Sequence, residues 1–144
     1  FAQVTAERYF NDTRWRRTLQ GLTRAYAERR DAMLEAIEEH FPAEAHYTRP
    51  EGGFFVWVEL PPFVDTKAML AEAVERGVTY VPGDGFFPDG RGRNCMRLAF
   101  CYVEPEKIRE GIARLAEVLE DRLELYRAFA AAGVLPAATA DERG

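Results

Sequence analysis

Arg97 is the residue whose type and position in this sequence point most clearly to chemistry. It stands in the middle of NCMRLAF (residues 94–100), a β-prone segment with few other polar side chains. Side chains alternate along a strand, so the small Cys95 and Ala99 share the face of Arg97, whereas Leu98 lies on the other. An arginine is always charged and offers a planar fork that fits a carboxylate through two hydrogen bonds. Because an unpaired buried cation is very costly, Arg97 must meet a structural acid, reach solvent or await an anionic ligand.

A glycine-rich turn shortly before this strand is a second candidate. Gly83-Asp84-Gly85 follows an expected strand, as a phosphate-binding turn would, but Phe86-Phe87-Pro88 comes next, where such a turn needs the start of a helix. A plain turn is therefore the favoured interpretation. Phe86 and Phe87 either line a pocket or pin the loop to the sheet.

The remaining reactive side chains form no catalytic or metal-binding set. The sequence contains no serine and only two histidines, His40 and His46, so neither a nucleophile–histidine–acid set nor a metal-ligand spacing is found. Cys95 and Cys101 would lie roughly 20 Å apart on one strand, at about 3.3 Å per residue. A disulfide needs Cα atoms within about 7 Å, so both thiols should be free, which favours a reducing compartment, the cytoplasm.

The composition is that of an ordinary globular domain. The chain has 144 residues, of which 47% are hydrophobic and 30% charged, which favours one domain with a real core. The net charge of −5 argues against a nucleic-acid partner for this segment. No apolar run approaches the length of a membrane span, so we expect no membrane partner. The first residue is Phe1, and we expect a piece of a longer chain.

The hydrophobic periodicity predicts three helices and three strands. Helices are expected over 14–40, 66–76 and from 104 to about 132, and strands over 54–58, 78–81 and 95–100. The continuous apolar run at 54–58 predicts a strand buried on both faces. The order predicts an α+β fold, a small, largely antiparallel sheet with helices packed on it. If the strands at 54–58 and 78–81 are parallel neighbours, their connection should be right-handed.

Particular side chains are expected in the core. Val74 should point inward from the second helix, and Trp57 and Tyr80 should lie in the core. The first helix presents one apolar face, made of Trp15, Leu19, Leu22, Tyr26, Met33 and Ile37.

Four motifs occur in an order and spacing that resemble a known family. They are RPEGGFFVWVELP (49–61), GVTYVPGDGFF (77–87), NCMRLAF (94–100) and EGIARLAEVL (110–119). Together they resemble the C-terminal small domain of a class I/II, fold-type-I aminotransferase that depends on pyridoxal phosphate. The aminoadipate and aromatic group is the most similar, and its catalytic module also occurs fused to winged-helix regulators of the MocR-like kind.

This resemblance assigns roles to individual residues. It implies that Arg97 binds the α-carboxylate of an amino-acid substrate, which would be the anion that the charge awaits. Phe86–Phe87 match a loop near the active-site mouth, and Asn94 matches a residue that enters the strand there. Gly52–Gly53 match paired structural glycines, which we expect to allow a sharp bend and a close backbone approach.

The resemblance also implies a cofactor that this segment does not bind by itself. Pyridoxal 5′-phosphate would belong to the full-length parent and be held by residues of the large domain, which include a lysine and an aspartate. Lys67 begins one helix and Lys107 lies in the first turn of another, and neither position predicts the desolvated pocket that lowers a lysine pKa. We therefore expect no catalytic residue in this segment and no activity from it alone.

The implied reaction is the transfer of an amino group between an amino acid and a 2-oxo acid. The expected partners are that small-molecule substrate, the missing large domain of the same polypeptide and a second copy in a homodimer. Residues 1–13 would be a lead-in from the large domain, 14–126 the small domain, and 127–144 a helix end with a flexible tail.

Two alternatives remain open. The strand-helix-strand-strand-helix order from 54 to 125 is close to a ferredoxin-like core, which would make the chain a freestanding ligand-binding or regulatory module. In that case Arg97 would bind an effector or a structural acid. The other alternative is the catalytic-like domain of a GntR-type transcriptional regulator, whose DNA-binding part would lie outside this segment.

Overall fold

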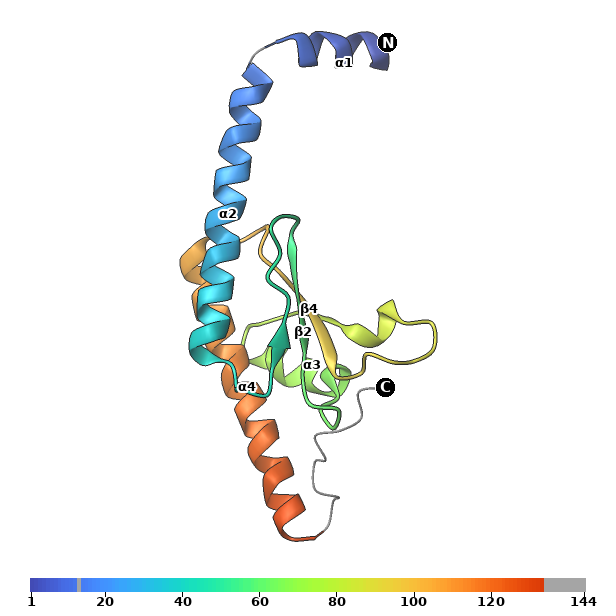
Figure 1. Cartoon of the computed structure of the whole chain (residues 1–144), viewed down its shortest axis with the longest axis vertical. Coiled ribbons are helices and arrows are strands. Elements are labelled where there is room, and N and C mark those ends of the chain that lie inside the picture. The colour runs from blue at the N-terminus through green and yellow to red at the C-terminus, as the bar shows by residue number, and fades with distance from the viewer. Residues whose placement is uncertain (13, 134–144) are drawn as a thin grey trace.

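The computed structural model describes residues 1–12 and 14–133 and contains a helical layer and a small sheet (Figure 1). The helices are α1 (Ala2–Asn11), α2 (Arg14–His40), α3 (Thr66–Glu75), α4 (Pro105–Ala131) and the short 3-10 helix η1 (Gly83–Phe86). The strands are β1 (His46–Tyr47), β2 (Phe55–Glu59), β3 (Val81–Pro82) and β4 (Cys95–Ala99). The predicted α+β class is confirmed.

The sheet is antiparallel throughout, with the strand order β1-β2-β4-β3. β2 and β4 pair over five residues, with Trp57 opposite Arg97 and Val58 opposite Met96. β2 and β3 run in the same direction, but β4 lies between them. The β-α-β connection through α3 therefore joins strands that are not neighbours.

Only one face of the β2–β4 pair is buried in the core. Val56, Val58 and Met96 are fully buried against residues of α2 and α4, whereas Phe55 is 40% exposed and Trp57 is half-buried. The prediction that this strand is buried on both faces is wrong, and so is the placement of Trp57 in the core. The reason is that α2 and α4 pack on a single side of the sheet. Tyr80 does lie in the core, as predicted.

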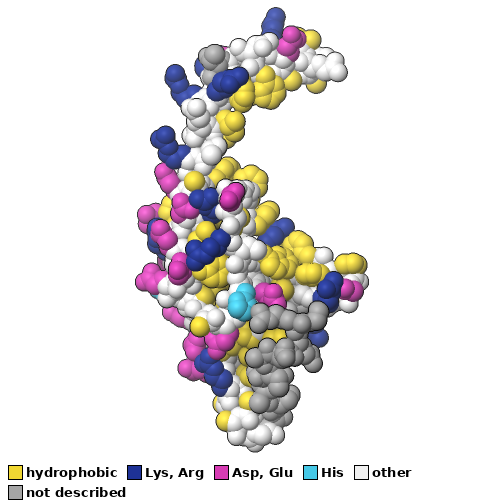
Figure 2. Space-filling model, viewed as in Figure 1, with side chains coloured by type: hydrophobic (Ala, Val, Ile, Leu, Met, Phe, Trp, Pro, Cys, Tyr) yellow, Lys and Arg dark blue, Asp and Glu magenta, His cyan; other side chains and the backbone are white. Residues whose placement is uncertain are grey.

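The long helix α2 is buried only in its C-terminal half. Met33 and Ile37 are in the core, but Leu19 and Leu22, on the same predicted apolar face, are 52% and 47% exposed. Figure 1 shows that α1 and the N-terminal half of α2 extend beyond the sheet as an arm. Figure 2 shows hydrophobic side chains gathered along the inner side of this α1–α2 arm. The helix is where the pattern predicts it, but Leu19 and Leu22 in its first half stay exposed within the described chain.

The start of α3 is tied to the start of β4. The Asp65 carboxylate caps the helix by accepting hydrogen bonds from the N–H groups of Lys67 and Ala68, and it pairs with Arg93 at 2.5 Å. The buried Thr66 hydroxyl donates to the carbonyl of Cys95 at 2.7 Å. These contacts hold the segment just before β4 against the start of α3.

Two details of the α3–β3 region differ from prediction. Val74 is 54% exposed instead of inward, because the opposite side of α3, with Met69 and Ala73, faces the core. The strand expected over 78–81 is reduced to β3, because the Val78 N–H donates to the Ala73 carbonyl and so completes the helix end.

Two regions at the chain ends complete the description. Helix α1 forms within residues 1–13, where the sequence predicted only a lead-in. Of the segment expected to hold a helix end and a tail, residues 127–131 belong to α4, and 134–144 lie outside the described residues. Within the described ranges, no helix combines the length and apolarity needed to cross a bilayer.

Replacing Asp65 by Ala should lower the free energy of unfolding by about 0.5–2 kcal/mol, as the loss of an N-cap usually does. The pKa of Asp65 is lowered, chiefly by the side-chain hydrogen bond from Arg93 and then by the N–H of Ala68. A carboxylate with a lowered pKa stabilises the fold above its unfolded pKa of about 3.9 and loses that contribution as the pH falls through the folded value.

Urea unfolding should therefore show the full difference at pH 7 and a shrinking difference below about pH 4. Asp89→Ala is the control, because exposed Asp89 pairs with Arg91 but caps no helix, and it should cost less than about 0.5 kcal/mol. Equal losses at pH 7 for the two variants would contradict this account of the α3 start.

Candidate functional site

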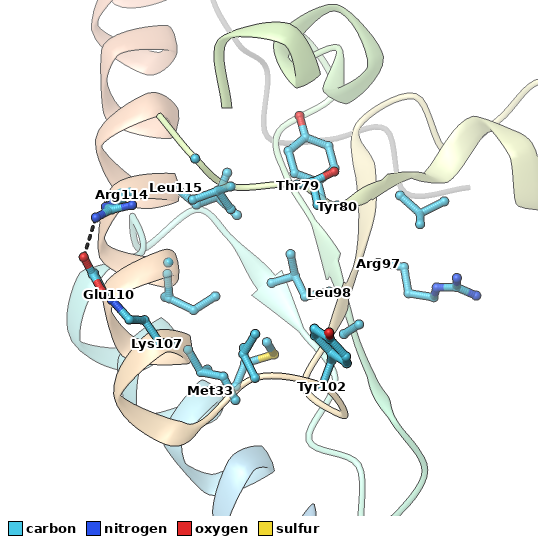
Figure 3. A pocket seen from close by; sticks show the side chains of 18 residues that line it. Met33, Thr79, Tyr80, Arg97, Leu98, Tyr102, Lys107, Glu110, Arg114 and Leu115 are labelled. Carbon is cyan, nitrogen blue, oxygen red and sulfur yellow. Dashed lines mark hydrogen bonds and ion pairs between the residues drawn. The ribbon is translucent and has the colours of Figure 1, made fainter. Parts of the chain in front are cut away.

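Arg97 projects from the middle of β4 on the face of the sheet that α2 and α4 leave open. In Figure 3 its side chain leaves the strand away from Met33 and Leu115, which belong to the helical layer. A cavity of about 490 Å³ lies on the helical side, between the β3–β4 edge and the first half of α4. Arg97 is one of the residues that line this cavity, but its guanidinium points away from it (Figure 3).

Two aromatic rings surround the guanidinium of Arg97. Its central carbon lies 4.0 Å from the ring centroid of Phe55 and 4.9 Å from that of Phe86. Phe55 reaches it diagonally across the sheet, because Phe55 lies two residues before Trp57, the strand partner of Arg97. Within residues 1–12 and 14–133 the Arg97 side chain forms no ion pair, and its Nε is buried without a hydrogen-bond partner.

These contacts reduce the alternatives left open for Arg97. A structural acid is excluded within the described part of the chain, because no carboxylate pairs with this side chain. Cation–π contacts of this kind contribute about 0.5–2 kcal/mol, and they leave the positive charge unneutralised. The arrangement can therefore accept an anion at the terminal nitrogens of Arg97.

The loop that carries η1 brings Phe86 over the sheet. Lys67 at the start of α3 pairs with Asp84 in η1 at 2.9 Å. The Trp57 ring makes edge contacts with Phe86 and Phe87, at centroid distances of 5.3 and 6.0 Å. Phe86 thus both contacts Arg97 and helps to fix the loop, whereas Phe87 contacts Trp57 and lies under the guanidinium of Arg91. The turn at 83–85 is a 3-10 turn that the Lys67–Asp84 ion pair ties to the start of α3.

The other residues singled out from the sequence lie at the ends of the strands. The Asn94 side-chain amide donates to the Leu60 carbonyl at 2.5 Å, so Asn94 ties the entry of β4 to the end of β2. Gly53 has a positive φ of 81°, which provides the expected bend. Nothing in the described chain lies within 4 Å of a Cβ placed on Gly52 or Gly53, so the expected close backbone approach does not occur within it.

The two thiols are free, as expected. Cys95 is buried and Cys101 half-buried. Burial raises the pKa of the Cys95 thiol, which opposes formation of the thiolate that a nucleophile or metal ligand requires. Among the described residues, no group of three or more His, Cys, Asp or Glu side chains is placed to hold a metal ion.

Sequence reasoning missed Phe55 and misplaced Trp57, two of the three β2 residues on the face of Arg97. The alternation signal was present, since Phe55 and Trp57 alternate with Val56 and Val58. It was hidden because all four residues are apolar, so polarity could not separate the open face from the core face.

Comparison with known proteins identifies the class. No family model matches the chain. It is 48% identical over 123 residues to aromatic-amino-acid aminotransferase 1 of Thermococcus litoralis, a match that covers 85% of this chain and 30% of that protein. It is 41% identical over 107 residues to the 2-aminoadipate transaminase of Thermus thermophilus, covering 74% of this chain and 27% of that protein. HTH-type transcriptional regulators of Escherichia coli and Bacillus subtilis also match, at 27% and 26% identity.

A solved structure agrees with these matches. The kynurenine aminotransferase of Pyrococcus horikoshii, solved in complex with PMP, superposes with a TM-score of 0.80 at 46% identity, over 85% of this chain and 30% of that one. The chain is therefore homologous to part of an aminotransferase. More narrowly, it is similar to the aromatic and aminoadipate members of that class. It spans about 30% of the length of these relatives.

The lysines of the described chain do not fit covalent attachment of pyridoxal phosphate. Lys67 and Lys107 each have 71% of their side chains exposed, and they pair with Asp84 and Glu110. The hydrogen bond from Lys67 to Asp84 raises the pKa of Lys67, the opposite of what a nucleophilic lysine needs.

Gly83→Ala should displace η1 and disturb the contacts of Phe86. A Cβ on Gly83 would come within 2.6 Å of both the Cys95 Cβ and the Gly92 carbonyl oxygen. Such overpacking usually costs about 1–3 kcal/mol, and the emission of Trp57 should change because its ring contacts move. A Trp15→Phe background leaves Trp57 as the fluorophore, since the sequence has two tryptophans.

Gly85→Ala is the matched control, because nothing lies within 4 Å of a Cβ at Gly85. It should leave thermal stability and Trp57 emission almost unchanged. If Gly83→Ala behaves like Gly85→Ala in both measurements, the close packing of η1 on β4 is not what holds this loop.

Proposed function

We propose that this chain is the substrate-carboxylate-binding domain of a pyridoxal-phosphate-dependent aminotransferase, which transfers an amino group between an amino acid and a 2-oxo acid. The observation that carries the proposal is the guanidinium of Arg97, which has no acid partner in the described chain and lies on an open sheet face between two aromatic rings. Homology supplies the reaction class. The activity would belong to the whole polypeptide.

In this role Arg97 receives the α-carboxylate through hydrogen bonds from its two terminal nitrogens. A bidentate pair fixes the orientation of the amino acid as well as its position. The rings of Phe55 and Phe86 keep water from the faces of the guanidinium, and a charge acts more strongly where water is excluded. Arg97 stays protonated throughout, because a guanidinium does not deprotonate in proteins, so it binds and orients the substrate without moving a proton.

The rest of the polypeptide would supply what these residues lack. The cofactor would be held there, and the exposed inner side of the α1–α2 arm, with Leu19 and Leu22, is a surface that further chain could cover. Monomeric proteins seldom expose a continuous apolar surface of this kind without a partner. The whole polypeptide would form a homodimer, as the resemblance implies. The aromatic lining of the loop agrees with Phe86 and Phe87 lying at the active-site mouth.

Arg97→Lys in the full-length polypeptide tests the proposal. Lysine keeps the charge but loses the fork, so the apparent KM for the amino acid should rise about 10- to 100-fold, since a hydrogen bond to a charged group contributes about 1.5–3 kcal/mol. Arg109→Lys is the matched control, because Arg109 on α4 is exposed and pairs with Glu35 on α2, and its KM should stay within about twofold. An unchanged KM in Arg97→Lys would remove Arg97 as the carboxylate-binding residue.

The described lysines give a second prediction. Mixed with pyridoxal phosphate and reduced with borohydride, the 144-residue chain should show no lysine modified in preference to the others, because both lysines are exposed and ion-paired. Peptide mass spectrometry would measure the modification at Lys67 and Lys107, with the unfolded chain as the control. Strong enrichment at either lysine in the folded chain, lost in Lys67→Arg or Lys107→Arg, would show that this domain binds the cofactor itself.

The matches to HTH-type regulators favour one second candidate. In it the parent is a transcriptional regulator that uses the same domain to bind an amino acid or a related acid. A basic winged-helix segment in the parent polypeptide would distinguish the two, because phosphate binding needs a basic surface. Arg97 would bind a carboxylate in either case.

A further inference from the structure

We propose that Phe55 and Phe86 are positioning residues, which hold the guanidinium of Arg97 between their ring faces and present its terminal nitrogens to the ligand. This inference rests on the proposed function for the identity of the ligand, an amino-acid carboxylate. The geometry itself rests on contacts within this chain.

The two rings come from different elements. Phe55 stands on β2, and its ring centroid is 4.0 Å from the Arg97 Cζ, well inside the range of about 6 Å for a cation–π contact. Phe86 is carried by η1, and its ring is 4.9 Å from the same atom. The edge contact of Trp57, at 5.3 Å, steadies the Phe86 ring in turn. Sheet pairing thus places one ring and the loop places the other.

The buried Nε of Arg97 shows that this orientation is imposed on the side chain. Its N–H has no acceptor within the described residues, and an unmade hydrogen bond at a buried donor is unfavourable. Buried polar atoms without partners are rare in folded proteins and call for a specific cause. We attribute it here to the packing of the two rings, whose centroids lie 4.0 and 4.9 Å from the adjoining Cζ. This burial without a partner concerns Nε and not the two terminal nitrogens of Arg97.

Rings suit this task better than an acid would. A carboxylate would also fix the guanidinium, but it would neutralise the charge and occupy the same N–H donors that a ligand carboxylate needs. Aromatic faces orient the cation and leave its terminal N–H donors free. A long, flexible side chain that is ordered before binding avoids an entropic cost, which corresponds to an affinity gain of roughly two- to tenfold.

NMR of the arginine Nε–H groups in the 144-residue chain tests the geometry. The Arg97 signal, identified by its loss in Arg97→Lys, should lie upfield of the other arginine Nε–H signals because of the ring currents, and it should exchange slowly with water. Phe55→Leu and Phe86→Leu should each move it towards the other signals, whereas Phe55→Tyr, which keeps the ring, should leave it in place. Phe54→Leu is the matched control, because the Phe54 ring contacts Tyr26 and Phe55 and makes no contact with Arg97.

An Arg97 signal among the others in the wild-type chain, or one unmoved in both leucine variants, would overturn the proposal. Phe86 is 44% exposed, so Phe86→Leu provides the test even if Phe55→Leu does not fold. In the full-length polypeptide, Phe55→Leu should raise the amino-acid KM roughly two- to tenfold with little change in kcat, and Phe55→Tyr should restore it. If the NMR shifts occur but Arg97→Lys leaves KM unchanged, the ring geometry stands and the proposed function fails.

Discussion

The site depends on the fact that α2 and α4 cover only one face of the sheet. The face of the sheet that the helices cover is fully buried at Val56, Val58 and Met96. The side chains on the opposite face of the same strands must therefore meet either solvent or the loop before β4. A guanidinium on the helical face would have to be desolvated among apolar groups, which no contact there would offset. On the open face the same residue keeps its charge, touches aromatic rings and remains accessible to an anion.

The loop between β3 and β4 converts this open face into a defined site. Its anchor is the start of α3, where Asp65 and Thr66 hold the segment before β4 and Lys67 holds η1. The contacts that stabilise a helix end therefore also determine where Phe86 lies relative to Arg97. The open sheet face around Phe55 and the α1–α2 arm both remain uncovered within the described chain.

Periodicity predicted the elements well, and the errors have a common physical cause. The helices α2, α3 and α4 and the strand that carries Arg97 were all visible in the sequence, because each depends on neighbours within a few residues. The errors at Trp57 and Val74, and the uncovered Leu19 and Leu22, concern which apolar side chain meets which partner. Burial of that kind depends on segments far away in the sequence, or outside it, and hydrophobicity alone does not encode the side on which they pack.

For the site, the sequence by itself determined that a cation stands in the middle of a strand and that four motifs occur in the order of an aminotransferase small domain. It could not choose among a structural acid, solvent and a ligand for Arg97. Only the tertiary structure decided that no acid of the described chain reaches Arg97, and that Phe55 and Phe86 enclose it instead. The physical reason is that strand register and loop path, which bring residues 55, 86 and 97 together, arise from pairings between distant segments and are not written in any local pattern.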